Sequence, residues 1–142
     1  MDTVEGMATS AQVEREVVEL HAFFVEWFGG RCPDDDATYA NRLVSRLTDD
    51  FFYVMPGGES LTREPLLTRL RAGYGQNPAF DIEVRDIRVR FEDARSVLAT
   101  YEERQTGARN SGQSDNRRLS TVLFVRDGAQ LRWHHIHETW LP

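Results

Sequence analysis

Two histidines near the C-terminal end, His135 and His137, are the first residues whose type and spacing could do chemistry. They fall in a predicted strand, where alternate side chains share a face, so both are expected beside Trp133. A His-x-His pair on a strand can begin a metal site, but such a site needs a third and a fourth ligand. Glu103 or His21 could supply one, yet nothing in the spacing requires a metal. Hydrogen-bonded histidines and histidines lining a ligand pocket remain the alternatives, and we expect no metal.

A second polar group interrupts an otherwise apolar strand. Tyr101 and Glu103 share one face of that strand. A carboxylate facing a partly buried cavity can have a raised pKa and can act as a general acid or base. The alternative is a structural ion pair between Glu103 and an arginine such as Arg90 or Arg118.

Composition excludes several classes of function. The 142 residues carry a net charge of −6, which opposes binding to nucleic acid or to an anionic membrane. All 17 basic residues are arginines, so catalysis through a lysine Schiff base is excluded. The single cysteine, Cys32, excludes an internal disulfide. There is no phosphate-binding loop, nucleophile elbow or dinucleotide fingerprint, and we expect no cofactor.

The chain length indicates one domain, predicted over residues 10–142 after a disordered tail at 1–9. No segment resembles a signal peptide or a membrane helix, so we expect a cytoplasmic protein. Apolar residues at helical spacing predict a first helix from an N-cap at Ser10 to about Phe28. A second helix is expected from about Pro33 to Asp50, followed by a strand at 51–55.

The second half of the chain changes from helical to strand periodicity. A third, short helix is predicted from a cap at Ser60 or Thr62 to Gly73. After it, the alternation of apolar and polar residues predicts strands at 81–91, 96–105, 117–126 and 130–140. A phase change at Arg85-Asp86 indicates a β-bulge. Asp127-Gly128 predicts a tight hairpin. This order indicates an α+β fold in which three helices pack on the concave face of a cone-shaped, curved antiparallel sheet.

The order of elements over residues 11–140 resembles the nuclear transport factor 2-like superfamily, also called SnoaL-like or cystatin-like cone proteins. The motifs that carry the resemblance are Leu47-Thr48-Asp49-Asp50-Phe51, Arg126-Asp127-Gly128 and Trp133-His134-His135-Ile136-His137-Glu138-Thr139. The last is similar to the ending of the calmodulin-dependent kinase association domain and of related small bacterial proteins. The resemblance implies a cone with an internal pocket and pairing of two copies through the outer face of the sheet.

The superfamily includes ketosteroid isomerase, whose catalytic residues do not match this sequence. Met55 and Val122 stand where the resemblance would place its two aspartates, and apolar residues around Phe23 and Phe24 stand where it would place its tyrosine. Fold alone does not choose among the other activities.

The resemblance implies a pocket that mixes aromatic and polar side chains, as ligand sites do. The residues that it would place there are Trp27, Tyr53, Tyr101, Glu103, Trp133, His135 and His137. We therefore predict a homodimer that binds a small hydrophobic or aromatic molecule. Two alternatives stay open. One is a lyase, isomerase or cyclase that uses His135 or His137 with Glu103 as acid and base, and the other is a non-catalytic association module.

Overall fold

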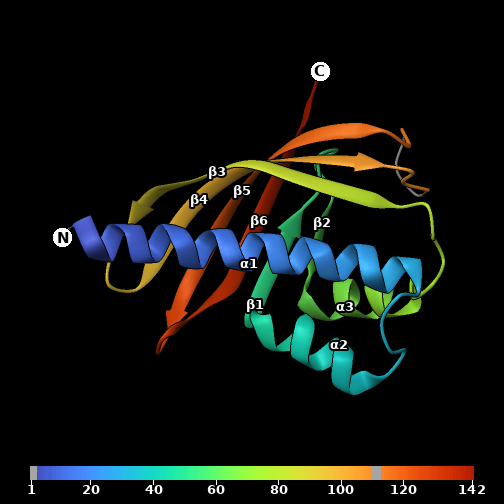
Figure 1. The fold of residues 1–142 in the computed structure, drawn as a ribbon, viewed down its shortest axis with the longest axis horizontal. Coiled ribbons are helices and arrows are strands. Elements are labelled where there is room, and N and C mark those ends of the chain that lie inside the picture. Colours follow the sequence, from blue (N-terminus) through green and yellow to red (C-terminus); the bar gives the residue numbers. More distant parts are fainter. Residues whose placement is uncertain (1–2, 110–112) are drawn as a thin grey trace.

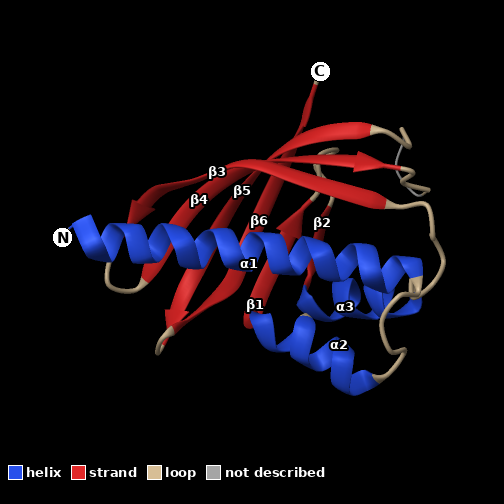
Figure 2. Cartoon of the chain, in the orientation of Figure 1, coloured by secondary structure: helices blue, strands red, loops and turns tan. Residues whose placement is uncertain are grey.

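The structure is a computed structural model that describes residues 3–109 and 113–142, with residues 3–7 described by their backbone alone. Its elements follow the predicted order of helices and then long strands, and the α+β class is confirmed (Figures 1 and 2). A long helix, α1 (Thr3–Gly29), lies across one face of a single sheet. The shorter α2 (Asp36–Arg42) and α3 (Arg63–Ala72) lie near the end of the sheet where β1 begins.

Two helix boundaries differ from the prediction. Helix α1 begins at Thr3, so Ser10 lies inside the helix and residues 3–9 are helical instead of forming a tail. Thr9 is buried there and accepts a hydrogen bond from Arg126, which indicates that this part of the helix packs on the sheet. Helix α2 is much shorter than expected. It starts after an N-cap at Asp35, whose carboxylate accepts the backbone N–H of Thr38, and the chain turns into a strand at Leu47.

Six strands form the sheet, in the order β2-β1-β6-β5-β4-β3. Their bounds are β1 (Leu47–Val54), β2 (Ser60–Thr62), β3 (Asp81–Glu92), β4 (Ser96–Thr106), β5 (Asn116–Asp127) and β6 (Gln130–Leu141). The four strands of the C-terminal half match the predicted ranges closely. The sheet is mixed, because β1 runs parallel to β6 while all other neighbours are antiparallel. The hairpin at Asp127-Gly128 is confirmed, with Gly128 at φ 60°.

Bulges in β3 and β6 decide which side chains face the helices. The bulge predicted at Arg85-Asp86 is confirmed: the register of β3 shifts there and Asp86 has φ 54°. The register of β3 shifts again between Val89 and Phe91. A further bulge, which we did not predict, lies in β6. Phe124 pairs with Trp133 and Leu123 pairs with His135, so His134 has no partner on β5. Beyond this residue, the side chains of β6 that would have faced the helices point to the outer face, and the others point inward.

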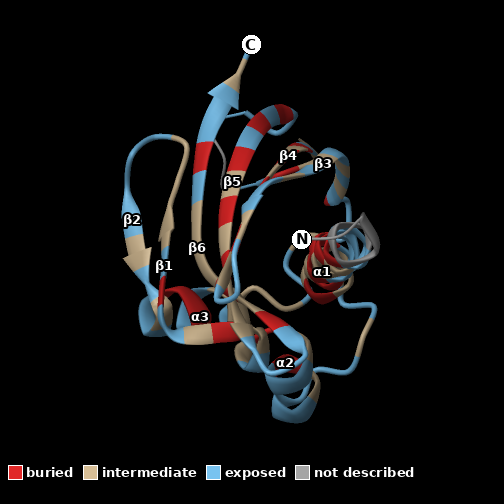
Figure 3. Ribbon diagram, turned by 90° about the vertical axis from the view of Figure 1, so that its left-hand side faces the viewer, coloured by how far each residue is buried: buried red, intermediate tan, exposed pale blue. Residues whose placement is uncertain are grey.

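The core lies between α1 and the concave face of the sheet. Buried and exposed residues alternate along β5, where Val122 and Phe124 are fully buried (Figure 3). The helix contributes Val13, Val17 and Leu20 to the same core. Within the described ranges, no helix is long and apolar enough to cross a membrane.

Candidate functional site

The core is incompletely filled at one end, where a cavity of about 150 Å³ lies between α1, α3 and the sheet. Most of its wall is apolar, but one end carries ionisable and hydrogen-bonding side chains. The apolar lining residues are Leu20, Phe24, Phe28, Leu43, Leu47, Phe51, Leu66, Leu70, Phe80, Ile82 and Ile136. The polar lining residues are His21, Tyr53, Tyr101, Glu103, Gln105, Arg118 and Glu138. An apolar cavity of this size can hold a six-membered ring.

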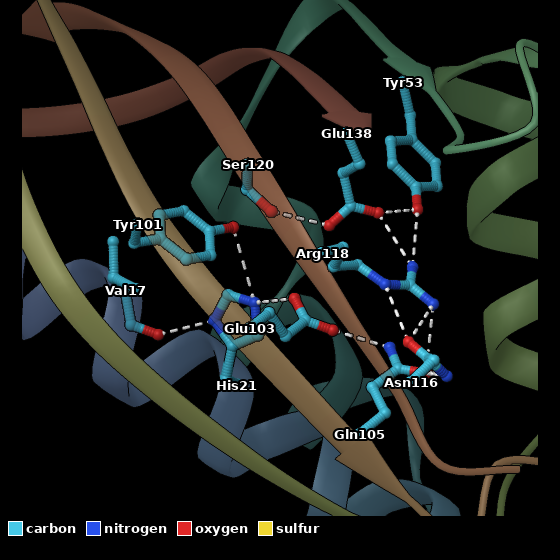
Figure 4. A network of polar contacts seen from close by, with 10 residues as sticks. All are labelled: Val17, His21, Tyr53, Tyr101, Glu103, Gln105, Asn116, Arg118, Ser120 and Glu138. Carbon is cyan, nitrogen blue, oxygen red and sulfur yellow. Dashed lines mark hydrogen bonds and ion pairs between the residues drawn. The ribbon is translucent and has the colours of Figure 1, made fainter. Parts of the chain in front are cut away.

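A buried ion pair joins α1 to β4 at the polar end. His21 Nδ1 lies 2.7 Å from the carbonyl oxygen of Val17, and His21 Nε2 lies 2.9 Å from Glu103 Oε1 (Figure 4). Both ring nitrogens therefore face acceptors, which favours the doubly protonated imidazolium. Burial opposes that charge, but the Glu103 carboxylate outweighs it and raises the pKa of His21. Burial would raise the pKa of Glu103, yet the charge and hydrogen bond of His21 lower it.

A second buried carboxylate, Glu138, lies on β6 in the same network (Figure 4). It accepts hydrogen bonds from Arg118 Nη1 at 2.9 Å, from the Ser120 hydroxyl at 2.8 Å and from the Tyr53 hydroxyl. Burial is the main cause that raises the pKa of Glu138, and the negative charge of Glu103 adds to it. The two carboxylates thus differ: Glu103 holds a proton weakly, and Glu138 holds one more strongly.

The remaining polar groups connect these two carboxylates. Gln105 donates its amide to Glu103 Oε2 at 2.5 Å and accepts from Arg118 Nη2 at 3.2 Å. The Tyr101 hydroxyl lies 3.4 Å from His21 Nε2, and Tyr101 is the neighbour of Ser120 across β4 and β5. The whole group is therefore held by its neighbours in one arrangement, as a preorganised site requires.

Three of the predicted pocket residues, Tyr53, Tyr101 and Glu103, line the cavity together. Trp27 and Trp133 are fully buried but do not line it. The indole of Trp27 donates to the Leu70 carbonyl oxygen at 2.9 Å, and that of Trp133 donates to Glu16 at 3.2 Å. Both tryptophans fill the core around the site.

The structure does not bring His135 and His137 to the cavity. We expected both to share a face with Trp133, and this expectation is wrong because the bulge in β6 lies between them and the tryptophan. His135 instead stacks on Phe52 of β1 with ring centroids 3.9 Å apart, on the outer face of the sheet. His137 is exposed on that same face.

Five of the polar residues at the site were not predicted to line the pocket: His21, Gln105, Arg118, Ser120 and Glu138. The sequence does carry a signal for two of them. Arg118 and Ser120 stand in phase with the buried Val122 on β5, and a charged residue in a buried phase needs a partner. Glu103 pairs with His21 in the structure, whereas Arg118, which we considered as its partner, pairs with Glu138.

Across the described part of the chain, no three histidine, cysteine, aspartate or glutamate side chains gather closely enough to hold a metal ion. His21, Glu103 and Gln105 are joined to one another by hydrogen bonds.

The His21–Glu103 pair predicts how stability changes with pH. A histidine whose folded pKa is raised stabilises the protein fully below its unfolded pKa, and this contribution is lost as the pH rises through the folded pKa. We therefore expect the free energy of unfolding to fall as the pH rises above about 6.5, the ordinary value for histidine. Urea denaturation across this range measures it. The double variant His21→Gln/Glu103→Gln is the control, and an identical pH dependence in both proteins would contradict the assigned ion pair.

Comparisons with known proteins support the fold. No protein-family model matches the sequence, and a search of the curated proteins gave no match. Among solved structures, the chain is similar to a nuclear transport factor 2-like protein of unknown function from Pseudomonas aeruginosa. The two are 26% identical, with a TM-score of 0.78 over 91% of this chain and 98% of that one.

Two further similar structures have names that denote an activity. One is proposed to be a scytalone dehydratase, from Novosphingobium aromaticivorans, with 10% identity and a TM-score of 0.73 over 99% of this chain and 89% of the other. The second is a hexachlorocyclohexane dehydrochlorinase from Novosphingobium barchaimii, with 14% identity and a TM-score of 0.66 over 99% and 92%. The predicted fold is thereby confirmed: the chain adopts the nuclear transport factor 2-like, cystatin-like fold.

Proposed function

We propose that this protein binds a small, largely apolar molecule in the cavity between α1 and the sheet and transfers a proton on it. One observation carries the proposal. Two buried carboxylates, Glu103 and Glu138, stand at one end of an otherwise apolar cavity, and their pKa values move in opposite directions. Titratable groups whose environments separate their pKa values are typical of acid–base sites.

Glu138 is the proton acceptor in this proposal. Its raised pKa makes it the stronger base of the two, and a general base works best when its pKa lies near the operating pH. Arg118, Tyr53 and Ser120 hold its carboxylate in place. Glu103 stays ionised and balances the charge of His21. Glu138 thus takes the role that we first considered for His135 or His137.

The reaction class that fits best is an elimination. Glu138 would take a proton from a carbon atom, the C–H electron pair would form a double bond, and a neighbouring substituent would leave. Where the substituent is a hydroxyl, Glu138 would return the proton to it and water would depart. Dehydratase and dehydrochlorinase, the names of two similar proteins, denote the loss of water and of hydrogen chloride.

Hydrogen exchange at cyclohexanone tests the proton-transfer step without knowledge of the substrate. In heavy water, Glu138 would remove a proton from the carbon next to the carbonyl group, and the resulting enolate would take back a deuteron from the exchanged carboxyl group. We expect the protein to accelerate deuterium uptake, followed by NMR, well above the rate in buffer. Exchange at the buffer rate, together with measured binding of the ketone, would reduce the proposal to ligand binding alone.

Self-association through the outer face of the sheet is the second part of the proposal. Phe52, Phe91 and Leu119 lie on this face and are 40%, 58% and 38% exposed. Leu98 and Leu123, which are partly buried, lie between them. These apolar side chains of β1, β3, β4 and β5, exposed among polar neighbours, are suited to pair with the same face of a second copy.

Substitutions on this face are expected to produce monomers. Phe91→Arg/Leu119→Arg adds two charges to the apolar face without touching the core, so we expect the dimer to weaken by at least about 100-fold. Sedimentation equilibrium measures the mass, and Val18→Arg, an exposed position on α1, is the control. Wild-type protein that sediments as a monomer would contradict the dimer.

A further inference from the structure

The hydrogen-bond donors and acceptors at the polar end of the cavity are unequally used. The donor hydrogens of the charged side chains are already committed within the protein, whereas the two carboxylates keep unused lone pairs. The imbalance restricts the chemistry of the molecule that can bind there, since a ligand must supply what the site lacks. This inference rests on the proposed function and specifies its substrate class.

The donors of the charged side chains are occupied. His21 directs one N–H to the Val17 carbonyl oxygen and the other to Glu103. Arg118 directs its N–H groups to Glu138, to Gln105 and to Asn116, and its Nη1 also lies 3.5 Å from the Tyr53 oxygen. The guanidinium group is therefore committed and is not open to a ligand anion.

Two of the three hydroxyl donors are committed in the same way. Tyr53 and Ser120 both donate to Glu138. Tyr101 lies beside His21 Nε2, which directs its N–H to Glu103, so the Tyr101 hydroxyl keeps its own hydrogen for a ligand. Of the polar side chains described above as lining the cavity, Tyr101 thus offers one hydroxyl hydrogen, and Gln105 offers the amide hydrogen that it does not give to Glu103.

Acceptor capacity remains on both carboxylates. An ionised carboxylate has about four lone-pair positions. Glu103 accepts from His21 and Gln105, and Glu138 accepts from Tyr53, Arg118 and Ser120. Their negative charges are balanced by His21 and Arg118, so no net charge is left to attract a cation. A ligand ammonium group would lose its hydration without gaining a free counter-ion.

We propose that the substrate is a small cyclic molecule with a hydroxyl group, which binds its ring against the apolar wall and donates the hydroxyl hydrogen to Glu138 or Glu103. A carboxylate or phosphate substrate is disfavoured, because it would face two carboxylates with only the neutral donors Gln105 and Tyr101 to satisfy it. A ketone can likewise use only these two neutral donors. The hydroxyl group is also the substituent that an elimination of water would remove.

Three six-membered rings with different polar groups test the inference: cyclohexanol, cyclohexanone and cyclohexanecarboxylate. Hydrogen bonds to a charged acceptor are stronger than those between neutral groups. We therefore expect cyclohexanol to bind about 10-fold more tightly than cyclohexanone, and the carboxylate to bind more weakly than either, in NMR titrations. Glu138→Gln replaces an acceptor with an amide of similar shape and should reduce the alcohol preference to about 3-fold or less. Val18→Ser, at an exposed position on α1, is the control and should leave the preference unchanged.

The outcomes separate this inference from the proposed function. Equal affinity for alcohol and ketone, or tightest binding of the carboxylate, would overturn the inference and leave the cavity as a binding site. If none of the three rings binds, the proposed function fails and the inference fails with it.

Discussion

Replacing Glu138 with glutamine is expected to lower the rate of protein-catalysed deuterium uptake into cyclohexanone by about 10²–10⁴-fold, the range that general acid–base groups contribute. The amide has nearly the same size and can still accept hydrogen bonds from Arg118 and Tyr53, but it cannot take a proton. We therefore expect the fold to remain, and the rate to fall to nearly that of the buffer. NMR measurement of the exchange rate at saturating ketone checks the prediction.

Glu102→Gln is the matched control for this experiment. Glu102 is the neighbour of Glu103 on β4, but it faces the outer side of the sheet, where it lies 3.6 Å from Arg117. The same chemical change at this position should leave the rate unaltered. An equal rate in Glu138→Gln and wild type would show that Glu138 is not the proton acceptor.

The largest effect on stability is expected at Arg118. Arg118→Met leaves Glu138 buried without its cation, and removing one partner of a buried ion pair typically costs about 3–5 kcal/mol in the free energy of unfolding. The unpaired carboxylate would bind a proton more strongly in the folded state, so its pKa would rise further. The loss of stability relative to wild type should therefore increase as the pH rises above the folded pKa that Glu138 has in the wild type. Urea denaturation at several pH values measures both effects.

The neighbouring arginine gives the control for this prediction. Arg117 lies on the exposed side of β5, and its ion pair with Glu102 is worth at most about 1 kcal/mol. Arg117→Met should therefore change stability little. The double variant Arg118→Met/Glu138→Leu removes both buried charges and should recover most of the loss, because well-packed apolar residues can replace a buried pair. Similar losses for Arg117→Met and Arg118→Met would contradict the buried pair.

The sequence predicted the long strands well because their signals are local. The alternation of apolar and polar residues along the strands, its interruption at Arg85-Asp86 and the Asp127-Gly128 turn each show within a few residues of sequence. Each is confirmed in the structure. The first strand was predicted less accurately. Leu43 and Leu47 continue a helical spacing, but the helix ends at Arg42, and pairing of β1 with β6 draws Leu47 into the sheet. Such pairing joins distant segments and leaves no local pattern.

The candidate site was predicted in part for the same reason. Tyr101 and Glu103 lie on a regular strand, so their phase relative to buried Val97 and Ala99 was readable. The bulge in β6 has no glycine and no other local signal, and it moved His135 and His137 to the outer face and Glu138 to the inner one. His21 has a partner on β4, 82 residues away, and only the packing of α1 on the sheet brings the two together.

We expect the interior cavity, rather than the outer face of the sheet, to bind the ligand. Methyl NMR during a cyclohexanol titration tests this expectation most directly. We predict chemical-shift changes at Leu20, Leu43 and Ile136, which line the cavity, and none at Leu98 and Leu123 on the outer face. Changes confined to Leu98 and Leu123, with the cavity methyl groups unaffected at saturation, would contradict the assignment of the site.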